Sequence, residues 1–174
     1  MSAKSKITIA FLLFGLLVAY CVYVSSVFSR GVSHQIVAAT TKDSYRAIPN
    51  KLALYYLYYG PTPAMTTKLG QPVLSFSIAG CGLGADCEKT IEVIDILIEK
   101  GADLNRTYDG MSLICEAVLL GEIVIVKALL ERGADLNTPI DRQGSPVNGM
   151  NADQFVNFLV TKDPERYKEI EALF

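Results

Sequence analysis

The sequence predicts an all-α protein in which one N-terminal transmembrane helix precedes a short solenoid of about four helix-turn-helix repeats. Two observations lead to this prediction. Residues 7–28 form a mostly apolar run without a charged residue, and the pentapeptide GADLN occurs at 101–105 and again at 133–137. The apolar run would rise about 33 Å as an α-helix, enough to cross a hydrocarbon core about 30 Å thick. The repeated pentapeptide indicates stacked helical units, because one such unit cannot bury its apolar face alone.

The run at 7–28 is interpreted as a retained signal-anchor helix, with residues 1–6 in the cytoplasm and residues 29–33 as a linker. The alternative is a secretory signal that is cleaved, since small residues such as Ser26 and Ser29 offer cleavage positions. The apolar part of such signals usually spans only about 7–15 residues, so the longer run here favours the anchor. We therefore expect a single-pass protein of the bacterial inner membrane, with secretion to the periplasm after cleavage as the alternative.

The orientation in the membrane depends on the cysteines, because basic residues flank the run on both sides: Lys4 and Lys6 before it, Arg30, Lys42 and Arg46 after it. Cys81 and Cys87 lie in the Gly-rich segment CGLGADC. A loop this short can close a disulfide, which persists only in an oxidising compartment. Two free thiols in a cytosolic loop are the alternative. Together with the anchor, the cysteine pair favours N-in topology with the C-terminal domain in the periplasm.

Each GADLN unit follows an apolar helical run, at 91–100 and at 123–132, with apolar residues spaced three and four apart. Gly101 and Gly133 end these runs, which is typical of a left-handed helix cap. Between the two units, DGMSLICEA at 109–117 resembles the D-G-x-T-P-L-H-x-A segment of the ankyrin repeat family. The repeat is completed by further matches at Gly121, Val126, Leu129, Leu130 and the second GADLN. Leu113 replaces the usual Pro and Cys115 the usual His, departures that weaken the hydrogen-bonded turn typical of the family.

The resemblance implies an ankyrin-like domain over residues 34–174, with weaker copies on either side of the clear repeat. We expect repeats to start near 34, 70, 110 and 144. The first would pair a helix at 34–46 with one at 50–60, and the last would pair helices near 151–161 and 164–173. The second repeat contains an insertion of eight residues, placed around CGLGADC.

A different interpretation concerns Gly80, Gly82 and Ala85, which fit the G-x-G-x-x-G/A turn of dinucleotide-binding folds if residues 73–79 form a strand. The expected acidic partner, Asp103, belongs instead to a repeated unit, and no other strand–helix alternation is visible. A nucleotide-binding enzyme is therefore only a remote alternative.

The remaining sequence does not predict an enzyme. His34 is the only histidine, so neither a zinc site nor a Ser-His or Cys-His pair is recognisable, and no P-loop is present. We expect no cofactor, no metal and no small-molecule substrate. Residues 29–174 carry 14 basic and 18 acidic side chains, a net charge of −4 that gives no basic footprint for nucleic acid.

The predicted activity is binding to another protein. The ankyrin resemblance implies recognition through the turn tips and the first helices, which here hold Arg106, Thr107, Tyr108, Met111, Leu119, Leu120, Pro139, Ile140, Asp141 and Arg142. Comparison of the repeats adds Leu54, Tyr58 and Tyr59, apolar or aromatic residues at positions where the sister repeats carry charge. Packing against residues 31–46, a partner protein or the membrane surface could cover them.

Ankyrin-like modules of small exported bacterial proteins resemble immunity proteins. The hypothesis that follows is a membrane-tethered immunity protein that neutralises a cognate toxin or effector in the periplasm. A scaffold or assembly factor of an envelope complex is the alternative.

Overall fold

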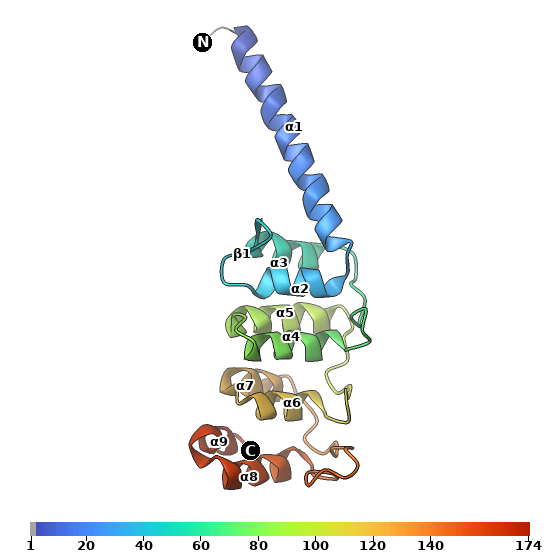
Figure 1. Cartoon of the computed structure of the whole chain (residues 1–174), viewed down its shortest axis with the longest axis vertical. Helices are drawn as coiled ribbons and strands as arrows, with labels where there is room; N and C mark the ends of the chain where they lie inside the picture. The colour runs from blue at the N-terminus through green and yellow to red at the C-terminus, as the bar shows by residue number, and fades with distance from the viewer. Residues whose placement is uncertain (1–2) are drawn as a thin grey trace.

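The computed structural model describes residues 3–174, which fold into nine helices and one two-stranded hairpin. A long N-terminal helix projects from a stack of four helical pairs, and the two helices of each pair run beside each other (Figure 1). The predicted mostly helical chain with a long apolar N-terminal helix is confirmed. The elements are α1 (Ala3–Phe28), α2 (Val32–Thr40), β1 (Ser44–Tyr45), β2 (Ile48–Pro49), α3 (Asn50–Tyr59), α4 (Val73–Gly82), α5 (Cys87–Glu99), α6 (Leu113–Leu120), α7 (Ile123–Glu131), α8 (Ala152–Lys162) and α9 (Pro164–Glu171).

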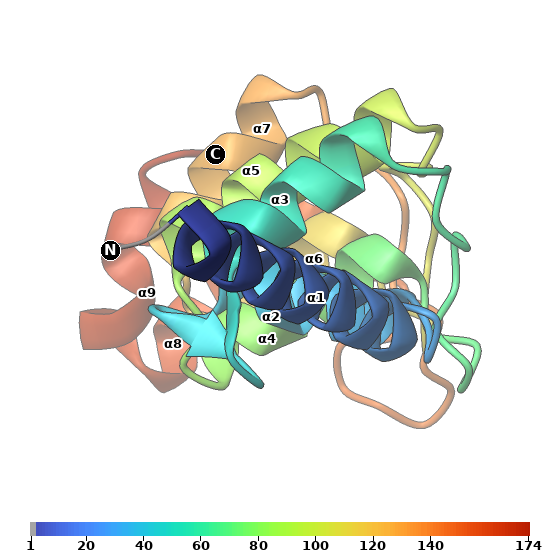
Figure 2. The ribbon, with the colours of Figure 1, turned by 90° about the horizontal axis from the view of Figure 1, so that it is seen from above.

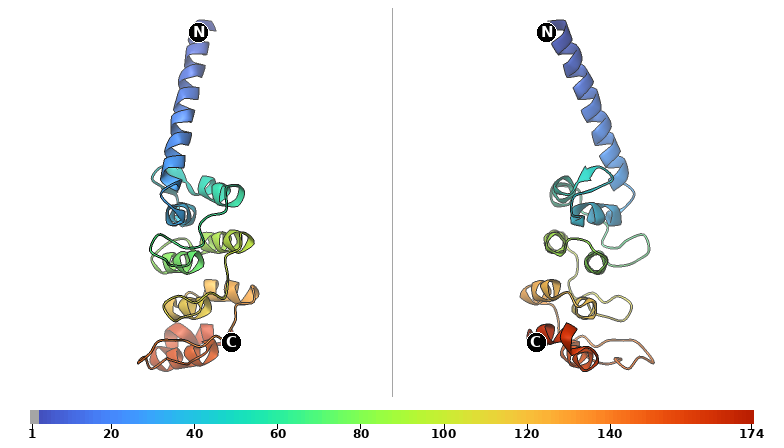
Figure 3. Two further views of the ribbon diagram at one scale, coloured as in Figure 1. Left: turned by 90° about the vertical axis from the view of Figure 1, so that its right-hand side faces the viewer. Right: turned by 60° about the vertical axis from the view of Figure 1, so that its left-hand side comes forward.

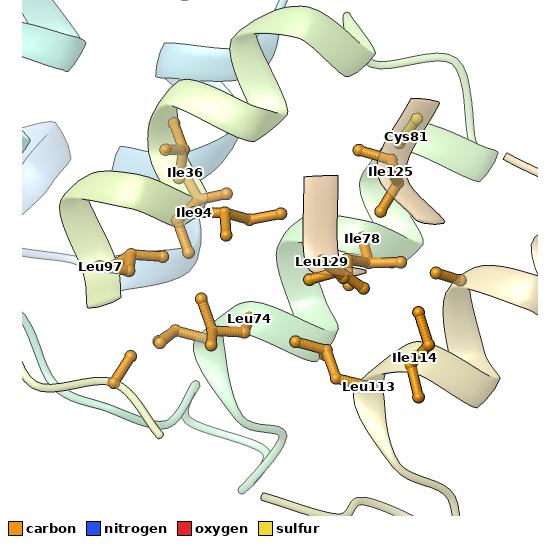
Figure 4. Close-up of a cluster of buried hydrophobic side chains, with 14 of the residues drawn as sticks. Ile36, Leu74, Ile78, Cys81, Ile94, Leu97, Leu113, Ile114, Ile125 and Leu129 are labelled. Carbon is orange, nitrogen blue, oxygen red and sulfur yellow. The ribbon is translucent and has the colours of Figure 1, made fainter. Parts of the chain in front are cut away.

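The core is a continuous apolar layer that crosses from one pair to the next. Leu74 and Ile78 of α4 lie one turn apart and are buried together with residues of α5, α6 and α7 (Figure 4). Residues that take part in this contact between pairs include Ile94, Leu97, Ile114, Ile125 and Leu129, all fully buried. The spacing of three and four residues thus places one apolar stripe of each helix toward its neighbours.

The glycine caps form as the sequence predicts. Gly101 and Gly133 have φ values of +98° and +78°. The next residues turn back to close the helix ends, since the amide of Ala102 donates to the carbonyl of Leu97 at 2.9 Å and that of Ala134 to Leu129 at 3.1 Å. These are the bonds of a Schellman cap. The two copies of GADLN therefore begin equivalent turns at the ends of α5 and α7.

Helix α1 is long and apolar enough to cross a membrane, either as an anchor or as a signal sequence. Most of its apolar side chains between Ile7 and Tyr23 are exposed, but its last turn is not, because Val24, Val27 and Phe28 are buried in the domain. The Phe28 ring lies 4.6 Å from that of Tyr56. The expected linker at 29–33 is thus reduced to a three-residue turn before α2.

The first repeat differs from expectation in its first helix, which spans Val32–Thr40 instead of 34–46. The chain turns at Arg46 and Ala47, whose φ values of 51° and 57° interrupt a helix, and pairs β1 with β2 in antiparallel register. The hairpin contacts α1, since the hydroxyls of Tyr20 and Tyr23 donate to the carbonyls of Ala47 and Arg46 at 3.0 and 2.9 Å. Figure 2 looks down on this end of the stack, with α1 nearest the viewer.

The strand that a dinucleotide-binding turn requires at 73–79 is helix α4. The only strands within residues 3–174 are the two short ones of the hairpin. Gly80 and Gly82 lie inside or at the end of α4, so their backbone does not form a strand-to-helix turn. The Gly-rich segment instead forms the end of α4 and the tight loop that leads to α5.

Candidate partner-binding groove

The first helices of the pairs lie on one side of the stack and the second helices on the other, as Figure 3 shows for the first three pairs. Two pockets open along the first helices. One, of about 600 Å³, lies between α2, α4 and the loop that follows α4. The other, of about 200 Å³, lies between α4, α6 and the turn tips. Both are lined by Gln71 and Ala79, so we treat them as a single inner groove.

The end of the inner groove nearest α1 is mostly apolar. Ile36 and Val37 of α2 face Phe76 and Ala79 of α4 across it, and Leu83 in the following loop contributes a side chain that is 89% exposed. A large exposed apolar side chain beside an apolar pocket is a typical contact point for a partner.

The loop at this end is closed by the predicted disulfide between Cys81 and Cys87, whose Cα atoms lie 5.1 Å apart. Asp86, inside the loop, caps α5 by accepting a hydrogen bond from the Lys89 amide at 3.2 Å, which lowers the pKa of this carboxyl. Cys81, Cys87 and Glu122 bring three potential metal ligands within 4.8 Å of one another. Because the disulfide uses both sulfurs, this cluster holds no thiolate while oxidised.

The other end of the inner groove contains an acidic group. Glu116 of α6 lies beside Ser75 of α4, between apolar neighbours on its own helix. Burial raises the pKa of Glu116 to about 7, and nearby Asp109 adds to the rise, while a hydrogen bond from Ser75 and the positive charge of Arg142 oppose it. The groove therefore offers a carboxyl group whose charge is poorly compensated, a natural contact for a basic side chain of a partner.

The turn tips form one edge of the inner groove. Arg142 donates to Asp109 twice, from Nη2 to Oδ2 at 2.6 Å and from Nε to the carbonyl at 2.9 Å. This joins the tip before α6 to the tip before α8. Gly110 allows the backbones of the two tips to lie close together, because a Cβ at this position would lie 1.9 Å from the carbonyl oxygen of Asp141. The two tips consequently form one connected edge.

Five of the sequence-predicted residues line the groove: Tyr108, Met111, Leu119, Leu120 and Arg142. Tyr108 and Leu119 are 38% and 42% exposed and can contact a partner directly. Arg106, Thr107, Pro139 and Asp141 are exposed on the tips without lining the pockets. Leu54, Tyr58 and Tyr59 lie on α3, away from the groove.

Two of the predicted contact residues are almost fully buried. Met111 and Ile140 are each only 1% exposed. Met111 forms a β-bridge with Tyr108, and Ile140 exchanges backbone hydrogen bonds with Gly149 and Met150. Met111 lines the inner groove with little exposed surface, and Ile140 lines neither pocket.

Sequence reasoning missed Glu116 and the α2–α4 end of the groove. Glu116 stands as the only charged residue in the apolar run LICEAVLL, a signal that the resemblance to a known repeat segment concealed. Leu83 was equally visible as a bulky apolar residue between two glycines. No model of a protein family matches this chain, and neither does any curated protein.

Proposed function

We propose that this chain is a membrane-anchored, ankyrin-like module that binds another protein through its inner groove. The observation that carries this proposal is the groove itself, a mostly apolar channel across α2, α4 and α6 with one poorly compensated carboxyl at Glu116. Such a channel suits a protein segment that presents apolar side chains and one lysine or arginine. Helix α1 would hold the module at the bilayer, where a tether raises the effective concentration of the two partners.

The proposed role within this class is immunity: occlusion of a toxin or effector that reaches the periplasm. Three features support it, namely the apolar helix α1, a disulfide that an oxidising compartment would preserve, and a groove for a protein ligand. In this topology residues 1–6 are cytoplasmic and the stack faces the periplasm.

A protection assay tests the role. The full chain is co-expressed with the product of a neighbouring gene, and survival is compared between wild type, Leu119→Glu and Val124→Glu. Leu119 lies in the groove at 42% exposed, whereas Val124 lies on α7, outside both pockets, at 45% exposed. We expect the wild type and Val124→Glu to protect and Leu119→Glu to fail, because a charge in an apolar contact leaves an unpaired ion in the complex.

Failure of the wild-type chain to protect would refute immunity but not binding. Photo-crosslinking from position 119, with position 124 as control, decides the broader proposal. Adducts formed only from 119 support the groove as the binding site, and equal adducts from both positions refute it. If the adducts contain housekeeping membrane components, the scaffold alternative replaces immunity.

A further inference from the structure

Charge is unequally distributed along the stack. Residues 29–70, which form the first helical pair and its loops, contain five basic side chains and one acidic, a formal charge of +4. Residues 71–174 contain nine basic side chains and seventeen acidic, a formal charge of −8. The first pair is also the one next to α1 (Figure 1). The end of the stack nearest the proposed membrane is therefore basic, and the rest is acidic.

Helix α1 leaves no spacer between a bilayer and this basic end. Its apolar stretch outside the folded domain runs from Ile7 to about Tyr23, which corresponds to about 25 Å of helix, less than a hydrocarbon core about 30 Å thick. The hydroxyls of Tyr20 and Tyr23 are bonded to the hairpin tip. A helix this short crosses the core only if the hairpin lies at the bilayer surface.

Tyrosines gather at the same end. Seven of the nine in the chain lie between residues 20 and 59. Tyr55 and Tyr59 are 61% and 68% exposed, with ring centroids 4.5 Å apart. Counted back from the helix-ending glycines, the residues equivalent to Tyr55 are Ile96 and Ala128, which are half-buried and buried. Those later helices have a preceding pair stacked on them, whereas α3 has none, so Tyr55 lies on the uncovered end of the stack.

Basic side chains accompany these tyrosines. Arg46 is exposed at the hairpin tip, and Lys51 is exposed one helical turn before Tyr55, on the same side of α3. Arg30, Arg46 and Lys68 all lie close enough to His34 to lower its pKa, after the larger effect of burial. The cations thus form a cluster around the base of α1.

We infer that this end of the stack, which we call the proximal face (the hairpin tip at 46–47 with Lys51, Tyr55 and Tyr59), docks on the headgroups of anionic phospholipids. Tyrosine is enriched where a protein meets the headgroup region, and each lysine or arginine near an anionic bilayer contributes attraction. This inference rests on the proposed role of α1 as a membrane anchor. Docking would fix how the inner groove is presented above the bilayer.

The test uses the absence of tryptophan from the chain. Tyr55→Trp places one fluorophore on the proximal face, and Tyr108→Trp places one on a distal turn tip as the matched control. Each full-length variant is reconstituted into vesicles of phosphatidylcholine, alone or mixed equally with phosphatidylglycerol, with brominated acyl chains as the quencher. We expect stronger quenching of Tyr55→Trp in the anionic vesicles than in the neutral ones, and none for Tyr108→Trp in either.

Removal of basic side chains gives a second test of the docking. Each cation near an anionic surface changes the ratio of docked to undocked protein about fivefold, so Arg46→Gln with Lys51→Gln in the Tyr55→Trp background should lower it about 25-fold. Lys162→Gln with Lys168→Gln, at the far end of the stack, should change nothing.

Quenching that is absent, or equal in neutral and anionic vesicles, would overturn the inference. Flotation of the chain with neutral vesicles separates the two proposals. A chain that fails to float refutes the anchor and the docking with it, whereas flotation without quenching refutes the docking alone.

Discussion

Replacement of Glu116 by glutamine tests the electrostatics of the inner groove directly. Burial raises the pKa of this carboxyl from 4.5 to about 7. Glutamine has nearly the same shape and can still accept a hydrogen bond from Ser75, but it carries no charge at any pH. The substitution therefore removes the cost of a buried ion while it leaves the packing of α6 against α4 in place.

The magnitude follows from the two pKa values. A carboxyl whose pKa is about 7 in the folded chain and 4.5 in the unfolded chain makes a difference of about 3 kcal/mol in the free energy of unfolding between low and high pH. Glu116 keeps some contact with solvent, and screening reduces the expected value to about 1–2 kcal/mol. Because the folded state binds the proton more tightly, this stability is fully present below pH 4.5 and is lost as the pH rises through 7.

The assay is thermal unfolding of the full chain in a non-ionic detergent, followed by far-ultraviolet circular dichroism. Above the pKa of Glu116, at about pH 8, we expect Glu116→Gln to melt about 2–8 °C higher than the wild type. At about pH 4 the variant and the wild type should have the same melting temperature, since residue 116 is then neutral in both. Glu131→Gln, which removes an exposed carboxylate of α7, is the control. A difference between Glu116→Gln and wild type that is the same at both pH values would refute the reasoning.

Three other experiments test what holds the stack together. Cys81→Ser with Cys87→Ser opens the short loop and should lower the free energy of unfolding by about 2 kcal/mol, with no further loss on adding reductant to the variant, as measured by thermal unfolding. Gly110→Ala should cost more than about 2 kcal/mol in urea denaturation, because the added Cβ would meet the Asp141 carbonyl; Gly133→Ala, with a similar φ but open space, should cost only about 1–2 kcal/mol, and equal costs would contradict this account. Arg132 binds Asp95 of the preceding pair at 2.5 and 2.7 Å, but both side chains are partly exposed, so a double-mutant cycle with Asp95→Asn and Arg132→Gln should give a coupling of about 0.5–1 kcal/mol that high salt reduces.

Features that depend on a short stretch of sequence could be predicted from the sequence. Helices α5 and α7 each combine an apolar period of three and four with a terminal glycine, and both ends adopt the expected cap. The disulfide was predictable for the same reason, since a Gly-rich loop of five residues keeps two cysteines close whatever the rest of the chain does.

Features that depend on contacts between distant segments were not predictable. Tyr20 and Tyr23 of α1 bind the tip of the hairpin at 44–49, and nothing in the local sequence pattern predicts this contact. The last turn of α1 looks like membrane helix in the sequence, yet it fills the end of the first helical pair. The burial of a turn residue is equally hard to predict: Ile140 lies in a turn tip, yet it is buried in the apolar core.

The inner groove and the proximal face share one structural connection. The Thr40 carbonyl at the end of α2 accepts the Asp86 amide of the disulfide loop at 2.8 Å. The Lys89 ammonium donates to the carbonyls of Thr41 and Lys42, just before the hairpin, at 3.1 and 2.8 Å. One wall of the groove is therefore bonded to the segment that carries the hairpin. Because rigid elements joined by such bonds move together, a partner seated between α2 and α4 would engage a surface whose position above the bilayer the proposed docking of the proximal face would fix.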